Sequence, residues 1–200
     1  MINDGDCIQT GIGAIPSAIL AKLKDKNDLG LHGGLIDEGS MALIRNGNVT
    51  GERKRIDRGF SVTGMALGES SLYETLINEA TVLFRGANYT HEVDTIKELD
   101  NFVSINSAIE VDLFGQVNSE FAGGKQLSGT GGAVDFMRAA KTSSGGRSII
   151  AMNATAKGGK KSKIVPKVEM VTALRTDVDI VVTEFGVARI KDLPVKERGR

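Results

Sequence analysis

Short runs of Ile and Val in this sequence are apolar at consecutive positions, without the alternation expected of a half-exposed strand. The densest runs cover residues 148–152 and 179–183, and each ends in polar residues. Strands that are apolar on both faces are typical of parallel sheets covered on both sides. Segments with helical periodicity lie between the runs, and strands that alternate with helices indicate an α/β protein. We therefore predict an open, mostly parallel sheet with helices on both faces.

The same patterns assign the remaining elements. A first helix is expected from Pro16, because proline is favoured in a first turn and apolar residues recur at helical spacing as far as Leu23. Helical patterns also cover residues 37–44 and 70–78, whereas residues 45–60 are polar and glycine-rich and predict a loop with a hairpin. Further strands are expected at residues 29–31, 62–65, 82–84, 102–105 and 108–113, with 115–117 as a continuation of the last.

Composition and charge limit the class of protein. Two hundred residues suffice for one domain or at most two small ones. Lys+Arg and Asp+Glu both number 25, so no net charge attracts the chain to nucleic acid or anionic lipid. No apolar run approaches the ~20 residues of a membrane span. The single cysteine, Cys7, excludes a disulfide framework and a Cys-rich metal site, and it fits a reducing compartment such as the cytoplasm.

Glycine is unusually abundant, with 25 residues. Two glycine clusters stand at predicted strand-to-helix turns, which is where open parallel sheets bind ligands. One contains Gly11 and Gly13, and the other contains Gly129, Gly131 and Gly132. The backbone N–H groups of such turns can converge on an anion. Each cluster is interpreted as a ligand-binding turn or, alternatively, as tight packing alone.

Polar side chains next to predicted strands are the other candidates. Asn106 lies between two apolar strand segments, where its amide completes a turn or donates to a developing oxyanion. Glu110 and Asp112 share one face of a strand, as a carboxylate pair or a solvated edge. Glu184 follows a buried strand, as a substrate-binding group or an acid near a helix N-terminus.

The chain has one cysteine and two histidines, His32 and His91. Their spacing does not suit a metal site, so no metal is expected. Cys7 and His32 are interpreted either as a nucleophile pair or, because Cys7 lies in an apolar segment, as packing residues.

Seven stretches together, in this order along almost the whole chain, resemble the acetyl-CoA hydrolase/CoA-transferase family, which includes 4-hydroxybutyrate, succinyl:acetate and itaconate CoA-transferases. They are GIGAIPSAIL (11–20), LGLHGGLIDEG (29–39), VSINSAIEVDLFGQVNSE (103–120), SGTGGAVDFMRAA (128–140), GGRSIIAMNATA (145–156), SKIVP (162–166) and DVDIVVTEFGVA (177–188). The resemblance implies a NagB/RpiA/CoA-transferase-like fold. It also implies transfer of CoA from an acyl-CoA to a carboxylate, or hydrolysis of a small acyl-CoA.

In the family, a glutamate attacks the thioester and forms an acyl-glutamyl anhydride and then a glutamyl-CoA thioester, from which a carboxylate takes the CoA. The asparagine that receives the thioester oxygen corresponds to Asn106, and the backbone N–H that assists it to Gly131 or Gly132. A glutamate that shapes the substrate pocket corresponds to Glu184. The glycines that the resemblance implies as CoA contacts are Gly11, Gly13, Gly129, Gly131 and Gly132.

The chain departs from the family at the nucleophile. Family transferases carry H-[ST]-E-[ML], whereas this sequence reads His32-Gly33-Gly34-Leu35. Gly34 therefore stands where the glutamate is expected and has no side chain to form an anhydride. Glu38, or Asp37 beside it, could replace the nucleophilic glutamate only if the loop after His32 were shifted. Hydrolysis through an activated water, a displaced nucleophile and CoA binding without turnover all stay open.

The second departure is length. Family members are considerably longer and have an N-terminal α/β domain that shares the active-site cleft. Residues 1–200 are therefore expected to form the C-terminal domain, as a fragment or a split subunit. The expected partners are a small acyl-CoA and a carboxylate, a second copy of the chain or a chain with the N-terminal domain, and no permanently bound cofactor. A sugar-phosphate isomerase on the related fold is the rival interpretation, but neither histidine lies in a convincing phosphate loop.

Overall fold

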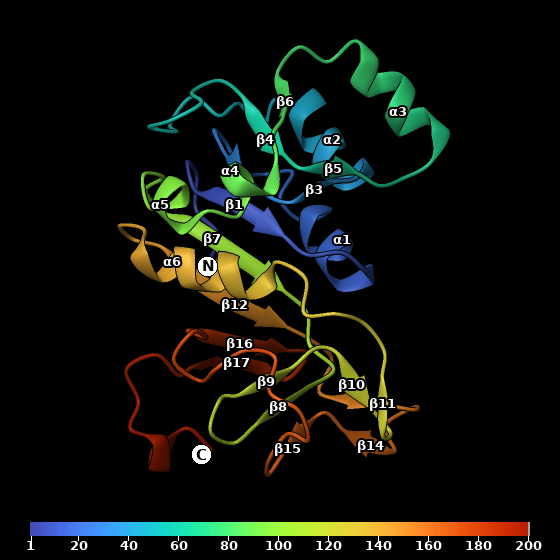
Figure 1. The fold of residues 1–200 in the computed structure, drawn as a ribbon, viewed down its shortest axis with the longest axis vertical. Helices are drawn as coiled ribbons and strands as arrows, with labels where there is room; N and C mark the ends of the chain where they lie inside the picture. The colour runs from blue at the N-terminus through green and yellow to red at the C-terminus, as the bar shows by residue number, and fades with distance from the viewer. Residues whose placement is uncertain (200) are drawn as a thin grey trace.

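A six-stranded sheet forms the centre of the computed structural model, which describes residues 1–199 (Figure 1). The strands lie in the order β17-β16-β12-β7-β1-β2, and every neighbouring pair is parallel except β16 and β17. Their bounds are β1 Cys7–Thr10, β2 Gly30–Leu31, β7 Phe102–Asn106, β12 Arg147–Ala151, β16 Ile180–Thr183 and β17 Gly186–Arg189. The prediction of an open, mostly parallel sheet is confirmed.

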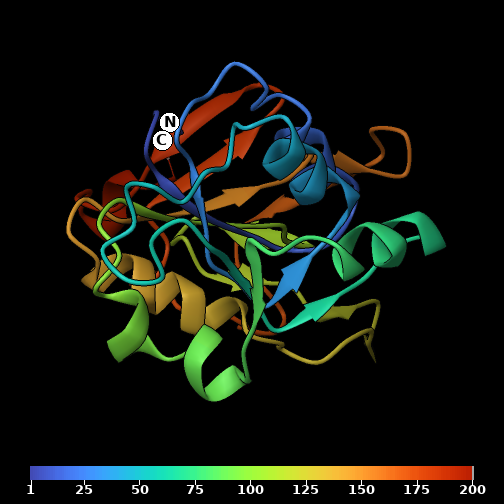
Figure 2. The same cartoon turned by 90° about the horizontal axis from the view of Figure 1, so that it is seen from above.

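Helices cover both faces of the sheet, which was also predicted (Figure 2). On one face, α6 (Ala133–Thr142) packs against β7 and β12, with the short helices α4 (Ala87–Thr90) and α5 (Val93–Ile96) beside it. On the other face lie α1 (Ala14–Leu20) and α2 (Glu38–Arg45).

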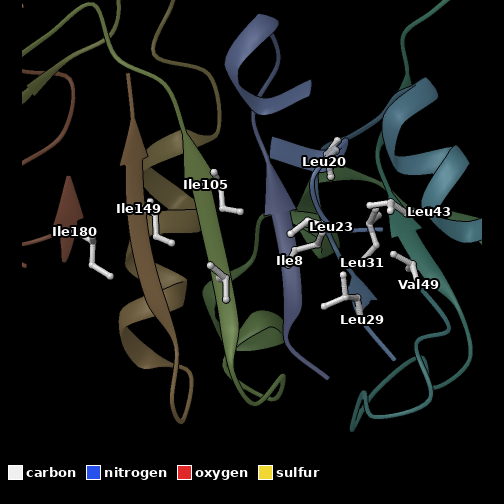
Figure 3. Packing of buried hydrophobic residues seen from close by; sticks show 11 residues of the cluster. Ile8, Leu20, Leu23, Leu29, Leu31, Leu43, Val49, Ile105, Ile149 and Ile180 are labelled. Carbon is white, nitrogen blue, oxygen red and sulfur yellow. The ribbon is translucent and has the colours of Figure 1, made fainter. Parts of the chain in front are cut away.

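The strands are apolar on both sides because each side is covered by its own layer. Ile8, Ile105, Ile149 and Ile180 stand on neighbouring strands and pack with side chains of α1 and α2 in one cluster (Figure 3). Ile150, one residue along β12, points to the opposite face and is fully buried in another cluster. Burial of an Ile side chain stabilises the fold by about 1.5–3 kcal/mol. The consecutive Ile and Val residues thus fix the layered architecture.

Small sheets and one further helix surround this centre. Two parallel pairs extend beyond β2 toward α3 (Ser70–Ile77): β3 with β5, and β4 with β6 (Figure 1). The remaining pairs and the three-stranded sheet β15-β8-β9 lie beyond β16 in the same view. The bounds are β3 Leu35–Ile36, β4 Ser61–Thr63, β5 Met65–Ala66, β6 Val82–Phe84, β8 Glu110–Asp112, β9 Val117–Asn118, β10 Phe121–Ala122, β11 Lys125–Gln126, β13 Thr155–Ala156, β14 Lys161–Ser162, β15 Ile164–Val165 and a 3₁₀ turn Val195–Glu197.

The predicted hairpin within residues 45–60 is wrong. This segment is irregular, and its backbone bonds to the residue before β2 instead: the N–H groups of Thr50 and Gly51 both donate to the carbonyl of Leu29. The buried ammonium of Lys54 donates to the carbonyl of Phe60 at 2.8 Å. A buried cation needs such oxygen partners, and this bond ties Lys54 to the end of the loop at Phe60.

The predicted continuation of the strand through residues 115–117 is also wrong, because the chain reverses after Asp112. The carboxylate of Asp112 accepts the backbone N–H groups of Phe114 at 3.0 Å and Gln116 at 2.9 Å. Gly115 adopts a φ of 90°, a left-handed conformation that favours glycine. The segment therefore returns as β9, antiparallel to β8.

Glu110 and Asp112 form neither a carboxylate pair nor a solvated edge. Both are buried, and each has its own partner. Oε1 of Glu110 lies 2.8 Å from Nζ of Lys161 in an ion pair, whereas Asp112 organises the turn. Their role in the described structure is to hold the loops around β8.

Two smaller differences concern helices and strand edges. α1 begins at Ala14 rather than Pro16, with Gly13 as its N-cap at φ 115°. β17, α4 and α5 were not predicted, because each is short and depends on packing against its neighbours. Among residues 1–199 there is no helix with the length and apolar character needed to span a membrane.

Candidate functional site

A cavity of about 500 Å³ opens where the carboxyl ends of β1 and β7 meet the start of α6. Ligands of open parallel sheets bind at this edge, and both predicted glycine turns reach it. Residues from segments far apart in the sequence line the cavity, among them Thr10, Gly11, Ile12, Gly34, His91, Asn106, Gly129, Gly131, Gly132 and Phe136.

The second glycine turn supplies free hydrogen-bond donors. In the part of the chain that the structure describes, the backbone N–H groups from Gly129 to Ala133 donate to no protein acceptor. Gly131 has a φ of 57°, which turns the backbone at this point. These N–H groups precede the ten-residue helix α6, whose N-terminus carries a partial positive charge. The turn is thus built to receive an anionic oxygen.

The first glycine turn touches Asn106. A Cβ atom on Gly11 would lie 2.9 Å from Oδ1 of Asn106, so only glycine permits this approach. The structure therefore brings Gly11 and Asn106 together in the cavity lining, as the sequence predicted. Gly13 caps α1, is exposed and does not line the cavity.

Asn106 belongs to a buried polar network. Its Nδ2 donates to Oγ of Ser104 at 2.9 Å and to Oε1 of Gln9 at 3.3 Å. The hydroxyl of Ser104 donates to the same Oε1 at 2.8 Å. These bonds satisfy polar groups between β1 and β7, and they orient the Oδ1 atom of Asn106 toward Gly11. Gln9 and Ser104 were not predicted as site residues. They lie on β1 and β7, which are neighbours in the sheet but far apart in the sequence, so their contact becomes visible only once the strand order is known.

The residue that sequence reasoning missed most clearly is His91. Its ring fills the space beside Gly34, the residue at which the resemblance led us to expect the family glutamate. A Cβ atom on Gly34 would lie 2.9 Å from Cε1 and 3.0 Å from Nε2 of His91, and a Cβ atom on Gly132 would meet the same ring even more closely. The ring packs on Phe136, with centroids 4.5 Å apart. His91 thus occupies the gap between the two glycines.

The surroundings of His91 favour a neutral imidazole. Burial lowers the pKa of His91 below its ordinary value of 6.5, and the carboxylate of Asp135 opposes this shift. Nδ1 lies 2.8 Å from Oγ1 of Thr90. No described group hydrogen-bonds to Nε2, which faces Gly34 and Gly132. This nitrogen is the one free to meet a ligand.

The other predicted site residues lie outside the cavity. Asp37 is the N-cap of α2, and its Oδ1 accepts the N–H of Ser40 at 2.8 Å. Glu38 is exposed and accepts the N–H of Glu69 at 2.6 Å, which lowers its pKa. The suggestion that Glu38 replaces the nucleophile therefore does not fit this geometry. Glu184 lies at the same sheet edge, in the β16–β17 turn, where it accepts the N–H of Ala154 at 2.7 Å.

Cys7 and His32 do not form a nucleophile pair. Burial raises the pKa of the Cys7 thiol to about 12, and burial followed by the charge of Lys54 lowers the pKa of His32 to about 4. At neutral pH both are uncharged, so no thiolate forms. Among the described residues, no cluster of His, Cys, Asp and Glu suits a metal ion.

Known proteins resemble this chain in sequence and in fold. Residues 68–200 match the family described as "Acetyl-CoA hydrolase/transferase C-terminal domain". The chain is 43% identical over 203 residues to 4-hydroxybutyrate coenzyme A transferase of Clostridium kluyveri, and the match covers 100% of the chain and 47% of that protein. The chain spans about half the length of the curated relatives it matches.

Two solved structures agree with this match. RipA from Yersinia pestis superposes with a TM-score of 0.94 at 44% identity, over 98% of this chain and 45% of that one. The 4-hydroxybutyrate CoA-transferase of Porphyromonas gingivalis superposes with a TM-score of 0.88 at 39% identity, and the match covers 100% of this chain and 47% of that one. The fold is therefore that of the CoA-transferases, as the resemblance implied. On this sequence match and this architecture, the chain belongs to the acetyl-CoA hydrolase/transferase family.

Proposed function

We propose that this chain forms the C-terminal half of an enzyme that acts on small acyl-CoA thioesters, either transferring CoA to a carboxylate or hydrolysing the thioester. The observation that carries the proposal is the set of unpaired N–H groups from Gly129 to Ala133, whose residues line a cavity together with Gly11 and Asn106. Family membership supports the same chemistry.

The chemical reason is the charge that develops during acyl transfer. Attack on a thioester carbon turns the carbonyl oxygen into an oxyanion, and N–H groups already aimed at that oxygen lower the barrier. The N–H groups of Gly131 and Gly132 are our proposed donors. Asn106 is proposed to assist after a half-turn of its amide, because Nδ2 now donates to Ser104 and Gln9. Gly11 and Gly129 are proposed to let the pantetheine end of CoA approach the backbone.

A second candidate function follows from Gly34. Its lack of a side chain, together with the capping bonds of Asp37 and Glu38, favours a domain that binds CoA without forming a glutamyl intermediate. Such a domain would hold acyl-CoA in the same cavity. Measured turnover separates it from the first candidate.

We propose that a second protein surface completes the cleft, supplied by an N-terminal α/β domain or by another subunit. Ile12 and Met65 line the cavity and are 62% and 60% exposed, and apolar groups at the rim of a cavity fit a covering surface. Glu184 is then proposed to contact the carboxylate substrate from its own loop. The unpaired Cys7 fits the reducing cytoplasm, and no permanently bound cofactor is proposed.

The test is release of free CoA thiol from acetyl-CoA, measured with and without a carboxylate acceptor such as butyrate. Thiol release without acceptor indicates hydrolysis, and butyryl-CoA formation indicates transfer. If neither occurs while millimolar CoA raises the melting temperature, the CoA-binding candidate stands. Ligand at about 100 times its dissociation constant adds about 2.7 kcal/mol to the free energy of unfolding. Absence of turnover and of thermal stabilisation would contradict both candidates, and aldose–ketose conversion would favour the isomerase.

A further inference from the structure

We propose that His91 is the general base of this site: its Nε2 takes a proton from the water that attacks the thioester, so the site hydrolyses acyl-CoA without a glutamyl intermediate. This inference rests on the proposed thioester chemistry and specifies which group drives it.

The space beside Gly34 is taken by the ring of His91. Gly34 leaves a void where the family glutamate would stand, and the ring of His91 fills it: Nε2 lies 3.0 Å from the position of a Cβ atom on Gly34. Gly132 is equally necessary, because any side chain there would overlap the ring. Phe136 closes the third side at 4.5 Å between ring centroids. Because Gly34 and Gly132 have no side chains, the imidazole of His91 fits beside residue 34, where the carboxylate of the expected family glutamate is absent.

The tautomer of His91 decides whether Nε2 can accept a proton. In our proposal the proton is on Nδ1 of His91, which then donates to Oγ1 of Thr90 at 2.8 Å, and the Thr90 hydroxyl has the carbonyl of Gly86, 3.5 Å away, as its own acceptor. With the proton on Nδ1, Nε2 carries a lone pair. His91 lines the cavity, and its Nε2 has no hydrogen-bond partner among residues 1–199. Thr90 is fully buried and acts as a positioning residue.

The charges near the imidazole decide its protonation state. The titratable groups around the ring are Asp135 on α6, Glu92 beside it, and the buried His32. Burial outweighs the attraction of Asp135, so the pKa of His91 lies below 6.5 and the imidazole is neutral at pH 7. A base must be unprotonated to act, and a pKa near the working pH gives the best proton transfer.

The reaction balances without any other reagent. Nε2 accepts a proton from water as the water oxygen bonds to the thioester carbon, and the oxyanion is received by the N–H groups at Gly131 and Gly132. When the intermediate collapses, the carbon–sulfur bond breaks and the thiolate takes the proton from Nε2. The products are CoA thiol and a carboxylic acid, which ionises in water.

The test compares thiol release from acetyl-CoA by the wild type, His91→Asn and His91→Gln. We expect kcat to fall by about 10²–10⁴ in both variants, with the affinity for CoA retained. In the wild type, kcat/KM should rise with pH through the pKa of His91 and then level off. This rise should vanish in the variants. Glu98→Gln, an exposed change on the same segment and outside the cavity, should behave as the wild type.

Two further variants separate chemistry from folding. His91→Ala opens the ring space, and added imidazole should restore part of its activity. Thr90→Val keeps the shape but removes the acceptor of Nδ1–H, and it should shift the pH profile and lower kcat. A mere packing role for His91 predicts neither imidazole rescue nor a changed profile.

The outcomes distinguish this inference from the proposed function. If the wild type releases thiol and folded His91 variants match it at every pH, His91 is not the base, although thioester chemistry stands. Acyl groups found on His91 by peptide mass would make it a nucleophile and overturn the base role. If the wild type neither hydrolyses acetyl-CoA nor transfers CoA, the proposed thioester chemistry fails together with this inference, and only the CoA-binding candidate is left.

Discussion

Nε2 of His91 lies 3.0 Å from the point where a Cβ atom on Gly34 would stand. A side chain at residue 34 and the imidazole of His91 would therefore compete for one space, and this chain holds the imidazole. Gly34 does not have a positive φ, so its backbone would accept a side chain without left-handed strain. The ring of His91 is what excludes one.

This relationship predicts the behaviour of Gly34→Glu. The new Cβ atom would lie 2.9 Å from Cε1 of His91, and such overpacking costs about 1–3 kcal/mol. We expect a less stable protein that forms no glutamyl-CoA adduct. In Gly34→Glu/His91→Asn the smaller amide leaves room, and we expect an adduct that borohydride reduces and peptide mass locates.

Gly33→Ser is the matched control for Gly34→Glu. A Cβ atom on Gly33 makes an ordinary contact with Cγ of Gln9 at 3.4 Å, so stability should change little. An adduct in the Gly34→Glu single variant would show that the ring moves freely. A wild-type adduct at Glu38 or Asp37 would instead show a displaced nucleophile.

Two glycines of the loop before α6 should differ sharply. A Cβ atom on Gly132 overlaps the His91 ring, whereas one on Gly129 meets nothing within 4 Å. We expect Gly132→Ala to lower the free energy of unfolding by about 1–3 kcal/mol and to reduce thiol release. Gly129→Ala should leave stability nearly unchanged. Urea unfolding of both variants tests this, and equal stabilities would contradict the described position of the ring.

Asn106→Asp should affect both stability and turnover. The change removes the donor to Ser104 and Gln9 and buries a carboxylate in its place. Loss of a buried hydrogen-bond partner costs about 1–3 kcal/mol, which urea unfolding measures. If the amide also donates to the oxyanion, turnover falls by about 10²–10³. A folded variant with unchanged turnover would leave Asn106 a structural role only.

Acid should destabilise the protein before its carboxylates titrate. The pKa of His32 is about 4 in the fold, against 6.5 in the unfolded chain. The unfolded state therefore binds the proton first, and stability falls as pH drops from 6.5 to about 4. The free energy of unfolding falls by about 1.36 kcal/mol for each pH unit between the two pKa values, which amounts to about 3 kcal/mol in total. Urea unfolding across this window tests the loss, and NMR titration of the His32 ring tests its cause. Constant stability from pH 7 to 4.5 would contradict the burial of His32.

Much of the fold follows from local pattern. The strands at residues 148–152 and 179–183 were predicted within one residue of β12 and β16, because consecutive Ile and Val residues require cover on both faces. The two-residue strands, such as β13 and β14, carry no comparable pattern. They form because neighbouring loops bring their backbones together, and a short isolated pair has little stability of its own.

The site could be predicted only where its residues form a recognisable pattern within one short segment of the sequence. The loop with Gly131 and Gly132 shows itself as a glycine cluster before a helix. His91 carries no such signal: its importance depends on β2, α4 and α6 converging, which no sequence spacing expresses. For Glu38, its position near the motif suggested catalysis, and the structure shows it next to the N-cap of α2, where it accepts the N–H of Glu69; its catalytic role stays a prediction.

The most direct test of the account is a crystal structure with acetyl-CoA bound to the His91→Asn variant, which should hold the thioester without hydrolysing it. We predict the carbonyl oxygen within hydrogen-bond distance of the N–H of Gly131 or Gly132, and the thioester carbon facing residue 91 beside Gly34. Acetyl-CoA outside this cavity, or Glu38 against the thioester carbon, would contradict the account.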